Sequence, residues 1–133
     1  MKIEDISEDI IRRMQADKFA SVCGIKIEEI APGRAKASLR ITELHLNGVN
    51  IIQGGVLFTL ADYAFAMAAN SRGNVSVVTD ANITFIKGIS EGTIYAEARE
   101  ISCKRTLSKY TVNITDQNGE LLAVYNGTAF RKS

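Results

Sequence analysis

The sequence has few of the residues that most often assemble metal and redox sites. It contains one histidine, His45, and two cysteines, Cys23 and Cys103, which stand 80 positions apart. A zinc cluster could form here only if carboxylates or a second chain supplied the missing ligands. Two distant cysteines without a secretory leader indicate reduced thiols, and the acidic residues scattered over positions 1–20 argue against a leader or transit peptide. We therefore expect a cytoplasmic protein with no metal and no cofactor.

Proline and net charge are also scarce. One proline among 133 residues, with 46% hydrophobic and 23% charged residues, excludes collagen, a disordered tail and a proline-rich linker protein. Sixteen lysines and arginines oppose fifteen acidic residues, which gives no general attraction to phosphate backbones or anionic lipid. We expect no nucleic-acid partner and one domain over 1–133, which buries about two thirds of the surface of the unfolded chain.

The longest apolar stretch, residues 44–71, carries Asp62 as its only formal charge when its histidine is neutral. Its centre, residues 56–69, would be about 21 Å long as a helix, short of the roughly 30 Å that a bilayer core requires. Leu, Ala, Met and Phe favour helix, and glycines stand at both ends of the stretch. These features predict a buried central helix over 53–72 and no membrane span.

The rest of the sequence alternates apolar and polar residues, as half-buried strands do. Turn signals at Pro32-Gly33 and Asn118-Gly119 separate some of these segments. Isoleucines at helical spacing predict an N-terminal helical segment over 1–20, capped by Ser7. The predicted strands are 25–27, 34–42, 75–87, 93–103, 107–116 and 120–131.

Successive strands joined by short turns are mainly antiparallel. We therefore predict an α+β fold in which a sheet of about five to six strands wraps around one long buried helix, with a short N-terminal helix beside it. So small a sheet cannot enclose a helix that is apolar all round, and the helix surface left over predicts at least a two-fold dimer.

Asp62 has two interpretations. In the structural one, a neighbouring amide, hydroxyl or partner-chain group compensates the buried carboxylate. In the chemical one, Gly54 and Gly55 leave free N–H groups at a helix start, where the dipole adds positive potential that can stabilise an oxyanion. Gly54 and Asp62 lie about 12 Å apart along one helix, whereas reacting groups must come within about 3 to 3.5 Å. The chemical interpretation therefore requires two antiparallel helices and a site shared by two subunits.

Several short motifs in a fixed order, from about Gly24 onward, carry a resemblance to a known family. They are His45-Leu46-Asn47, Gln53-Gly54-Gly55, Leu60-Ala61-Asp62, Ala69-Asn70-Ser71, the segment 80–85, Gly92, Lys104-Arg105-Thr106 and Gly119. With these motifs the chain resembles the hotdog-fold acyl-CoA thioesterases, specifically their phenylacetic acid degradation (PaaI) branch. The resemblance implies a hotdog fold, a homodimer with a continuous sheet, commonly a homotetramer of two such dimers, and an acyl-CoA substrate.

The resemblance also implies catalytic roles. Asp62 corresponds to a general base or nucleophile, and the amide of Gly54 or Gly55 to the group that binds the thioester carbonyl oxygen. Asn47 corresponds to a residue that orients the carboxylate, the attacking water or the thioester. The alternative for Asn47 is a simple turn with the glycine that follows it.

Substrate-binding roles follow in the same way. Lys104, Arg105 and Thr106 are implied to bind coenzyme A phosphates, while the alternative is a solvated hairpin turn. Asp80 and Phe85 are implied to line the thioester and pantetheine channel.

One motif departs from the family pattern, because its usual His-Gly-Gly is Gln-Gly-Gly here. Gln53 can hydrogen-bond but cannot titrate near neutral pH. If the usual histidine positions groups, activity survives the change, and we favour this interpretation because Asp62 supplies the base. His45 could serve as a second base or be structural. Two functions stay open: an acyl-CoA thioesterase, or a non-catalytic acyl-CoA-binding module acting as sensor or scaffold.

Overall fold

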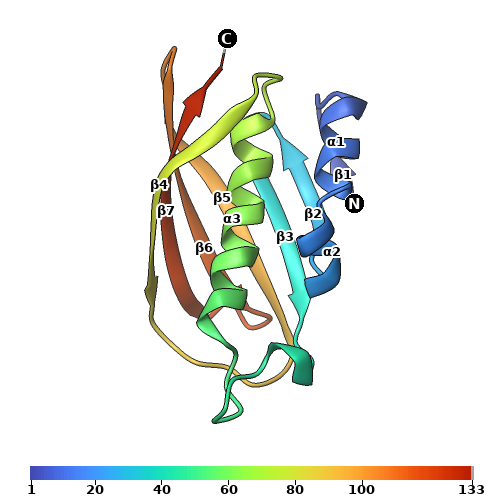
Figure 1. Ribbon diagram of the computed structural model, residues 1–133, viewed down its shortest axis with the longest axis vertical. Coiled ribbons are helices and arrows are strands. Elements are labelled where there is room, and N and C mark those ends of the chain that lie inside the picture. The colour runs from blue at the N-terminus through green and yellow to red at the C-terminus, as the bar shows by residue number, and fades with distance from the viewer. Residues whose placement is uncertain (133) are drawn as a thin grey trace.

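A long helix lies in the concave face of a curved, mostly antiparallel sheet (Figure 1). The computed structural model describes residues 1–132. The sheet has seven strands in the order β1-β2-β3-β5-β6-β7-β4. The strands are β1 (Lys2–Ile3), β2 (Lys26–Ala31), β3 (Arg34–Arg40), β4 (Ser76–Phe85), β5 (Thr93–Cys103), β6 (Leu107–Asp116) and β7 (Leu121–Arg131). The helices are α1 (Glu8–Gln15), α2 (Lys18–Cys23), the 3-10 turn η1 (Glu43–His45) and α3 (Gly54–Asn70).

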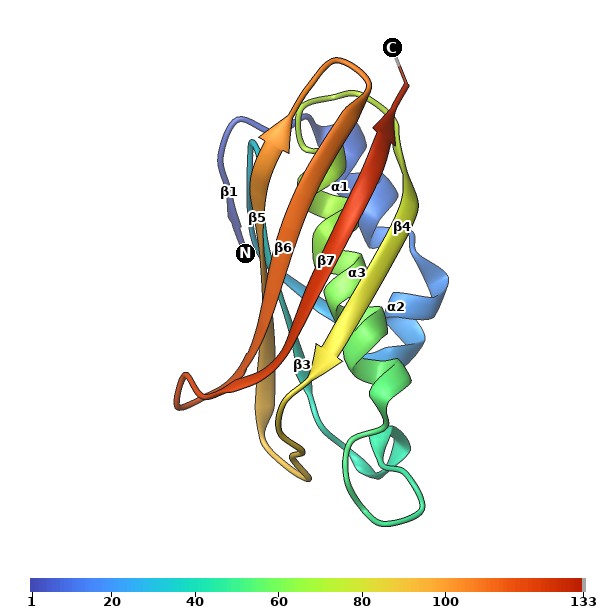
Figure 2. The same cartoon turned by 90° about the vertical axis from the view of Figure 1, so that its left-hand side faces the viewer.

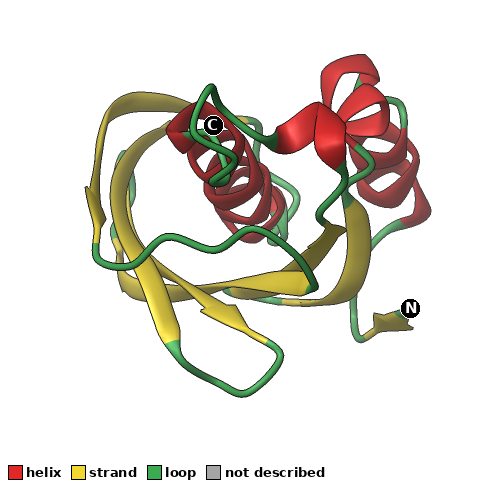
Figure 3. Cartoon of the chain, turned by 90° about the horizontal axis from the view of Figure 1, so that it is seen from below, coloured by secondary structure: helices red, strands yellow, loops and turns green. Residues whose placement is uncertain are grey.

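The central helix α3 is buried on most of its circumference, as its composition predicts. Its members Leu60, Ala61, Ala64, Met67 and Ala68 are completely inaccessible to solvent. It packs against β3, β5 and β6, and the sheet curls around it while α1 and α2 lie to one side (Figure 3). No helix within residues 1–132 is long and apolar enough to cross a membrane.

The predicted strands are confirmed to within a few residues at most ends, although β2 extends beyond the predicted 25–27 to Ala31. Gly33 and Gly119 adopt positive φ values of 76° and 82° in the two predicted turns. The Asp116 carboxylate accepts the backbone N–H groups of Asn118 and Glu120, which closes the second turn. The local turn chemistry therefore sets the strand boundaries.

The N-terminal segment departs from the prediction of one helical unit over 1–20. Lys2 and Ile3 pair in parallel with Glu29 and Ile30 of β2, which adds a seventh strand to the predicted five or six. The helical part divides into α1 and α2, because Asp17 accepts the N–H of Ala20 and begins a new helix. The predicted cap at Ser7 is confirmed by its bond from the N–H of Ile10.

One side of α3 stays uncovered next to β4, which is an edge strand bonded only to β7 among the described residues (Figure 2). Several large apolar side chains of this strand are exposed, including Val78 at 49% and Phe85 at 54%. The adjacent face of α3 presents Gly55, Asp62 and Ala66, which are at most partly buried. Figure 1 looks onto this open face, with β4 to its left and α1 and α2 to its right.

Close packing between β7 and α3 depends on a glycine. A Cβ atom at Gly127 would lie 3.0 Å from Cε1 of Tyr125 and 3.1 Å from Cε1 of Phe65. Both rings are buried in the core, so neither can move aside cheaply. Gly127 thus makes room for the aromatic cluster beneath the central helix.

We predict that Gly127→Ala lowers the free energy of unfolding by about 1 to 3 kcal/mol, the usual result of overpacking a core. Gly48→Ala is the matched control, because a Cβ at Gly48 meets nothing within 4 Å and its φ is negative or extended. Urea denaturation of both variants measures the difference. Equal stabilities for the two would contradict the packing argument.

Candidate active site

Asp62 lies on the open face of α3 and is hydrogen-bonded from the sheet. The phenol of Tyr125, on β7, donates to Oδ1 of Asp62 at 2.6 Å. Within residues 1–132 the second oxygen, Oδ2, accepts no hydrogen bond from the protein. The structural interpretation therefore holds for one oxygen of the carboxylate, and the other remains available for chemistry.

Tyr125 is itself held in the core and remains a proton donor. Burial, then the hydrogen bond to Asp62, and then the negative charges of Asp62 and Asp80 raise the pKa of Tyr125 far above its usual value. The phenol therefore keeps its proton wherever the protein is folded at ordinary pH.

The start of α3 offers two unsatisfied donors. The N–H groups of Gly54 and Gly55 have no acceptor among the described residues, as expected for the first turn of a helix. The side chain of Gln53 lies against Gly55, since a Cβ there would be 2.6 Å from its Oε1. The ring of Phe85 covers Gly54, with Cζ 3.0 Å from the place of a Cβ. Four predicted site residues, Gln53, Gly54, Gly55 and Phe85, are thus brought together.

An apolar cleft of about 320 Å³ opens at this helix start. Residues Ile51, Ile52, Gly54 and Leu57 form one wall, and the other runs from Phe85 at the end of β4 to Gly88. Asp62 does not line the cleft, because it stands eight residues further along α3, about 12 Å away. Within one chain the free N–H donors and the carboxylate therefore lie at separate places.

Asn47 takes the turn role that its sequence context left open. Its Oδ1 accepts the N–H groups of Val49 at 3.0 Å and Ile51 at 3.1 Å. These bonds shape the loop that leads into α3. That Asn47 orients substrate or water stays a prediction. Its side-chain nitrogen would have to do so, because its oxygen already accepts two hydrogen bonds.

His45 is buried and structural. The backbone N–H of Thr42 donates to its Nδ1 at 2.9 Å, which places the ring proton on Nε2, and Nε2 donates to the carbonyl of Cys23 at 2.7 Å. Nδ1 is therefore engaged by the residue that caps η1, and Nε2 ties η1 to the end of α2. His45 is absent from the cleft and does not touch Asp62.

The predicted phosphate-binding turn lies far from the cleft within one chain. Arg131 donates to the carbonyl of Lys104 and also to Asn74, just beyond the end of α3. The turn with Arg105 and Thr106 is therefore at the opposite end of α3 from Gly54 (Figure 2). Asp80 is exposed on β4. A single chain does not assemble these residues into one site.

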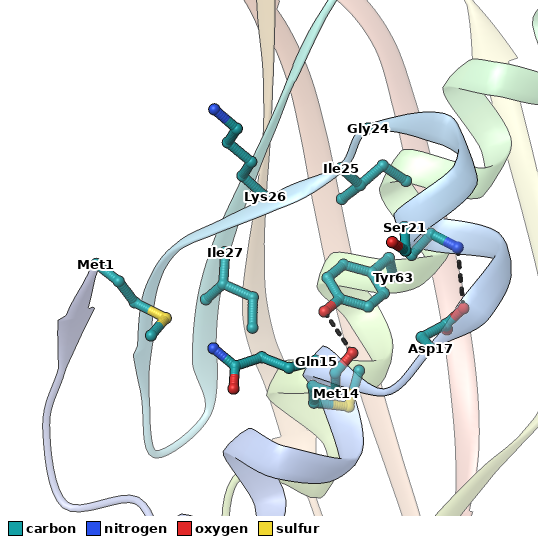
Figure 4. A pocket seen from close by; sticks show the side chains of 11 residues that line it. Met1, Met14, Gln15, Asp17, Ser21, Gly24, Ile25, Lys26, Ile27 and Tyr63 are labelled. Atoms are coloured by element: carbon teal, nitrogen blue, oxygen red, sulfur yellow. Dashed lines mark hydrogen bonds between the residues drawn. The ribbon is translucent and has the colours of Figure 1, made fainter.

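A larger hollow of about 490 Å³ lies on the far side of α3, between α1, α2 and β2 (Figure 4). Tyr63 forms part of its wall and donates to the carbonyl of Met14 at 2.7 Å. Tyr63 turns toward α1, whereas its neighbour Asp62 turns toward β7, so this hollow is separate from the candidate site. No three His, Cys, Asp or Glu residues of the described chain are grouped to hold a metal ion.

Comparison with known proteins decides the family. Residues 50–123, which include the helix start, Asp62 and β4, match the thioesterase superfamily. This chain belongs to the thioesterase superfamily. It is 33% identical to the acyl-coenzyme A thioesterase PaaI of Escherichia coli over 86% of this chain and 83% of that protein. It is 31% identical to human acyl-coenzyme A thioesterase 13, with 86% of each chain covered.

Solved structures of this superfamily agree with the fold. The E. coli PaaI structure superposes with a TM-score of 0.89 at 30% identity, covering 92% of this chain and 90% of that one. The phenylacetic acid degradation protein PaaI from Thermus thermophilus, solved as a mutant, gives a TM-score of 0.84 at 32% identity, covering 87% and 100%. The predicted hotdog fold and PaaI-type relationship are confirmed, and so is the predicted enzyme class, a thioester hydrolase.

Tyr125, which holds Asp62, is the residue of the candidate site that the sequence did not lead us to predict. The alternation in 120–131 places Tyr125 on the same side of the strand as Ala123 and Gly127, facing the helix. A buried tyrosine hydroxyl needs a hydrogen-bond partner, and Asp62 is the only charge on that helix. These two facts together could have predicted the contact between Tyr125 and Asp62.

We predict that the thioesterase loses stability as pH rises above about 10. Burial raises the pKa of Tyr63 to about 12 from the ordinary 10.0, and burial and hydrogen bonding raise those of Tyr110 and Tyr125 further. The pKa of each phenol is higher in the folded protein than in the unfolded chain. The stability that these protonated phenols contribute is therefore complete below pH 10 and declines as the pH rises above it. In a Tyr95→Phe variant, which keeps only these three of the four tyrosines, phenolate absorbance measured alongside circular dichroism should rise only as the protein unfolds. Ionisation of these phenols in a folded protein at pH 10 would refute the burial argument.

Proposed function

We propose that this thioesterase hydrolyses an acyl-CoA thioester to the free acid and coenzyme A at a site shared by two subunits. The observation that carries the proposal is that each chain holds two parts of an active site, which lie too far apart to work together within that chain. The cleft at Gly54 has free N–H donors but no base, and Asp62 has a free oxygen but no cleft. The acyl-CoA substrate class is supported by the names of the E. coli and human relatives.

The chemistry follows from these groups. The thioester carbonyl oxygen accepts a hydrogen bond from Gly54 or Gly55, and the helix dipole favours the negative charge that develops there. Asp62 of the partner subunit takes a proton from water, whose oxygen attacks the carbonyl carbon, or attacks that carbon directly. The carbon–sulfur bond then breaks, and the electron pair leaves with the thiolate of coenzyme A. After attack by water this step gives the free acid; after direct attack it leaves the acyl group on Asp62 as a mixed anhydride, which a water molecule then hydrolyses to the free acid and the regenerated carboxylate. A thiolate is a fair leaving group because the pKa of an ordinary thiol such as that of cysteine is only about 8.5.

The second subunit is argued from the uncovered face of α3. The edge of β4 carries unpaired backbone groups and exposed apolar side chains such as Val77 and Val78. An unprotected apolar edge strand invites pairing with another strand. Antiparallel pairing of two β4 strands across a two-fold axis would extend the sheet and bring Asp62 of one α3 toward Gly54 of the other. The remote turn with Lys104 would then also come from the other chain or from a further dimer.

Gln53 does not prevent this reaction. Its side chain lies beside the free N–H groups at Gly55, where an amide can orient a substrate without titrating. The base is Asp62, so a titrating neighbour is not needed. The apolar cleft of about 320 Å³ accommodates a short, medium or aryl acyl group.

We predict that Asp62→Asn lowers kcat by about 100- to 10,000-fold, the usual contribution of a general base. Asparagine keeps an oxygen that accepts the bond from Tyr125, so the fold is expected to persist. Release of free thiol from short, medium and aryl acyl-CoA thioesters measures the effect, and size-exclusion chromatography checks the assembly. Near wild-type kcat would remove Asp62 from the reaction. Tight binding by the wild type without hydrolysis of any substrate would favour a non-catalytic binding module.

We predict that Gly54→Pro loses about 100- to 1,000-fold in kcat relative to Gly54→Ala. Both substitutions add the Cβ that meets Phe85, but only proline removes the N–H. Proline suits the first helical position, and Gln53 already has the extended backbone that must precede it, with φ −71° and ψ 133°. Equal activities of the two variants would assign the donor role to Gly55 alone.

Mixing these variants tests the shared site. In a mixed dimer of Asp62→Asn and Gly54→Pro chains, one site joins a wild-type cleft with a wild-type Asp62 and the other has neither. Random pairing of equal amounts should restore about a quarter of wild-type activity, because half of the dimers are mixed and each has one complete site. Absence of any recovery in purified mixed dimers would show that each chain works alone.

A further inference from the structure

We propose that Tyr125 is a positioning residue, whose phenol holds Oδ1 of Asp62 so that Oδ2 is the oxygen presented to the thioester reaction. The inference rests on the proposed function, because it assumes that Asp62 acts in catalysis. It adds a residue on β7 to a site that otherwise consists of α3 and the segments at its start.

The contact itself is short and comes from a rigid donor. The 2.6 Å separation between the Tyr125 oxygen and Oδ1 of Asp62 lies in the range of strong O–H···O⁻ bonds. Tyr125 is 0% exposed. Solvent therefore does not compete for the phenol, and the bond links strand to helix across 63 residues of sequence.

The tyrosine ring is fixed by packing on several sides. The ring of Phe58 meets it edge-on at a centroid distance of 5.4 Å, and the ring of Phe65 lies tilted at 5.7 Å. The missing Cβ of Gly127 leaves space that the ring fills. Since the ring cannot rotate out of this cluster, the core determines where the phenol oxygen stands.

Nothing else in residues 1–132 holds the Asp62 carboxylate. Its only hydrogen bond within that part of the chain comes from Tyr125. His45 uses both ring nitrogens elsewhere, and Gln53, nine residues before Asp62, lies about 13.5 Å away along the helix axis within the same chain. A carboxylate held at one oxygen keeps a defined orientation, whereas a free one samples several rotamers and reaches the attack geometry less often.

The fold contains a matched control for this contact. Tyr110 is also buried, packs edge-on against Phe65 at 5.6 Å, and donates to a carboxylate, Oε2 of Glu100, at 2.9 Å. Glu100 is further paired with Arg72, beyond the end of α3. The carbonyl of Ala68 also lies 3.3 Å from the Tyr110 oxygen. The Tyr110 pair thus shares the tyrosine–carboxylate bond of the Tyr125 pair, but it lies away from Asp62 and the cleft.

The test compares Tyr125→Phe with Tyr110→Phe, which each remove one buried hydroxyl and keep the ring. For Tyr125→Phe we expect kcat for acyl-CoA hydrolysis to fall about 10- to 100-fold while KM changes by less than about twofold. For Tyr110→Phe we expect kcat to stay within about twofold of wild type. Both variants should lower the melting temperature, and activities are referred to folded protein measured by circular dichroism.

A double variant shows whether Tyr125 acts through Asp62. In the Asp62→Asn background, Tyr125→Phe should cause no further loss of the residual activity, because the group being positioned is already gone. An additive loss, or unchanged kcat in the Tyr125→Phe single variant, would overturn the positioning role. If Asp62→Asn itself keeps its kcat, the proposed function of Asp62 fails, which is a separate and distinguishable result.

Discussion

A helix of seventeen mostly apolar residues has to be covered on nearly every side, and this requirement shapes the whole molecule. Small alanines on β3 and β5, among them Ala37 and Ala96, let α3 approach the sheet closely, while bulky side chains from β6 and β7 fill the space further along. The N-terminal helices cover another side. The face beside β4 is left, and the one charged residue of the helix lies on it. Both the open face of α3 and the position of the candidate site on it follow because one chain has too few strands and helices to cover α3 completely.

Several buried polar side chains are hydrogen-bonded to distant parts of the chain. Tyr125 reaches Asp62, and Tyr110 reaches Glu100, which also pairs with Arg72. His45 joins η1 to α2. These contacts satisfy groups that would be costly to bury alone, and the Tyr125–Asp62 bond fixes α3 against the sheet. The Asp62 carboxylate is therefore held in one orientation by a rigid residue of the core.

Much of the fold could be predicted, because it depends on local patterns. The limits of α3 follow from its glycines and its composition, and the later strands follow from alternation and from turns such as Asn118-Gly119. The first residues could not be predicted in this way, since Ile3 suits a helix and a strand equally, and pairing with Ile30 of β2 decides between them. Only the structure could decide between the alternative roles of Asn47 and of His45, because each role depends on which atoms come within hydrogen-bond distance.

The sequence by itself determined that a single carboxylate would lie on an apolar helix behind a glycine pair, since composition and order alone carry that information. It also determined that Gly54 and Asp62 could not meet within one helix, because the helical rise is constant. Only the tertiary structure decided what Asp62 touches, which side of α3 stays open and that Tyr125 lies beneath it. Those outcomes depend on contacts between β7 and α3, 63 residues apart, and such contacts arise from the packing of the whole core rather than from any local pattern.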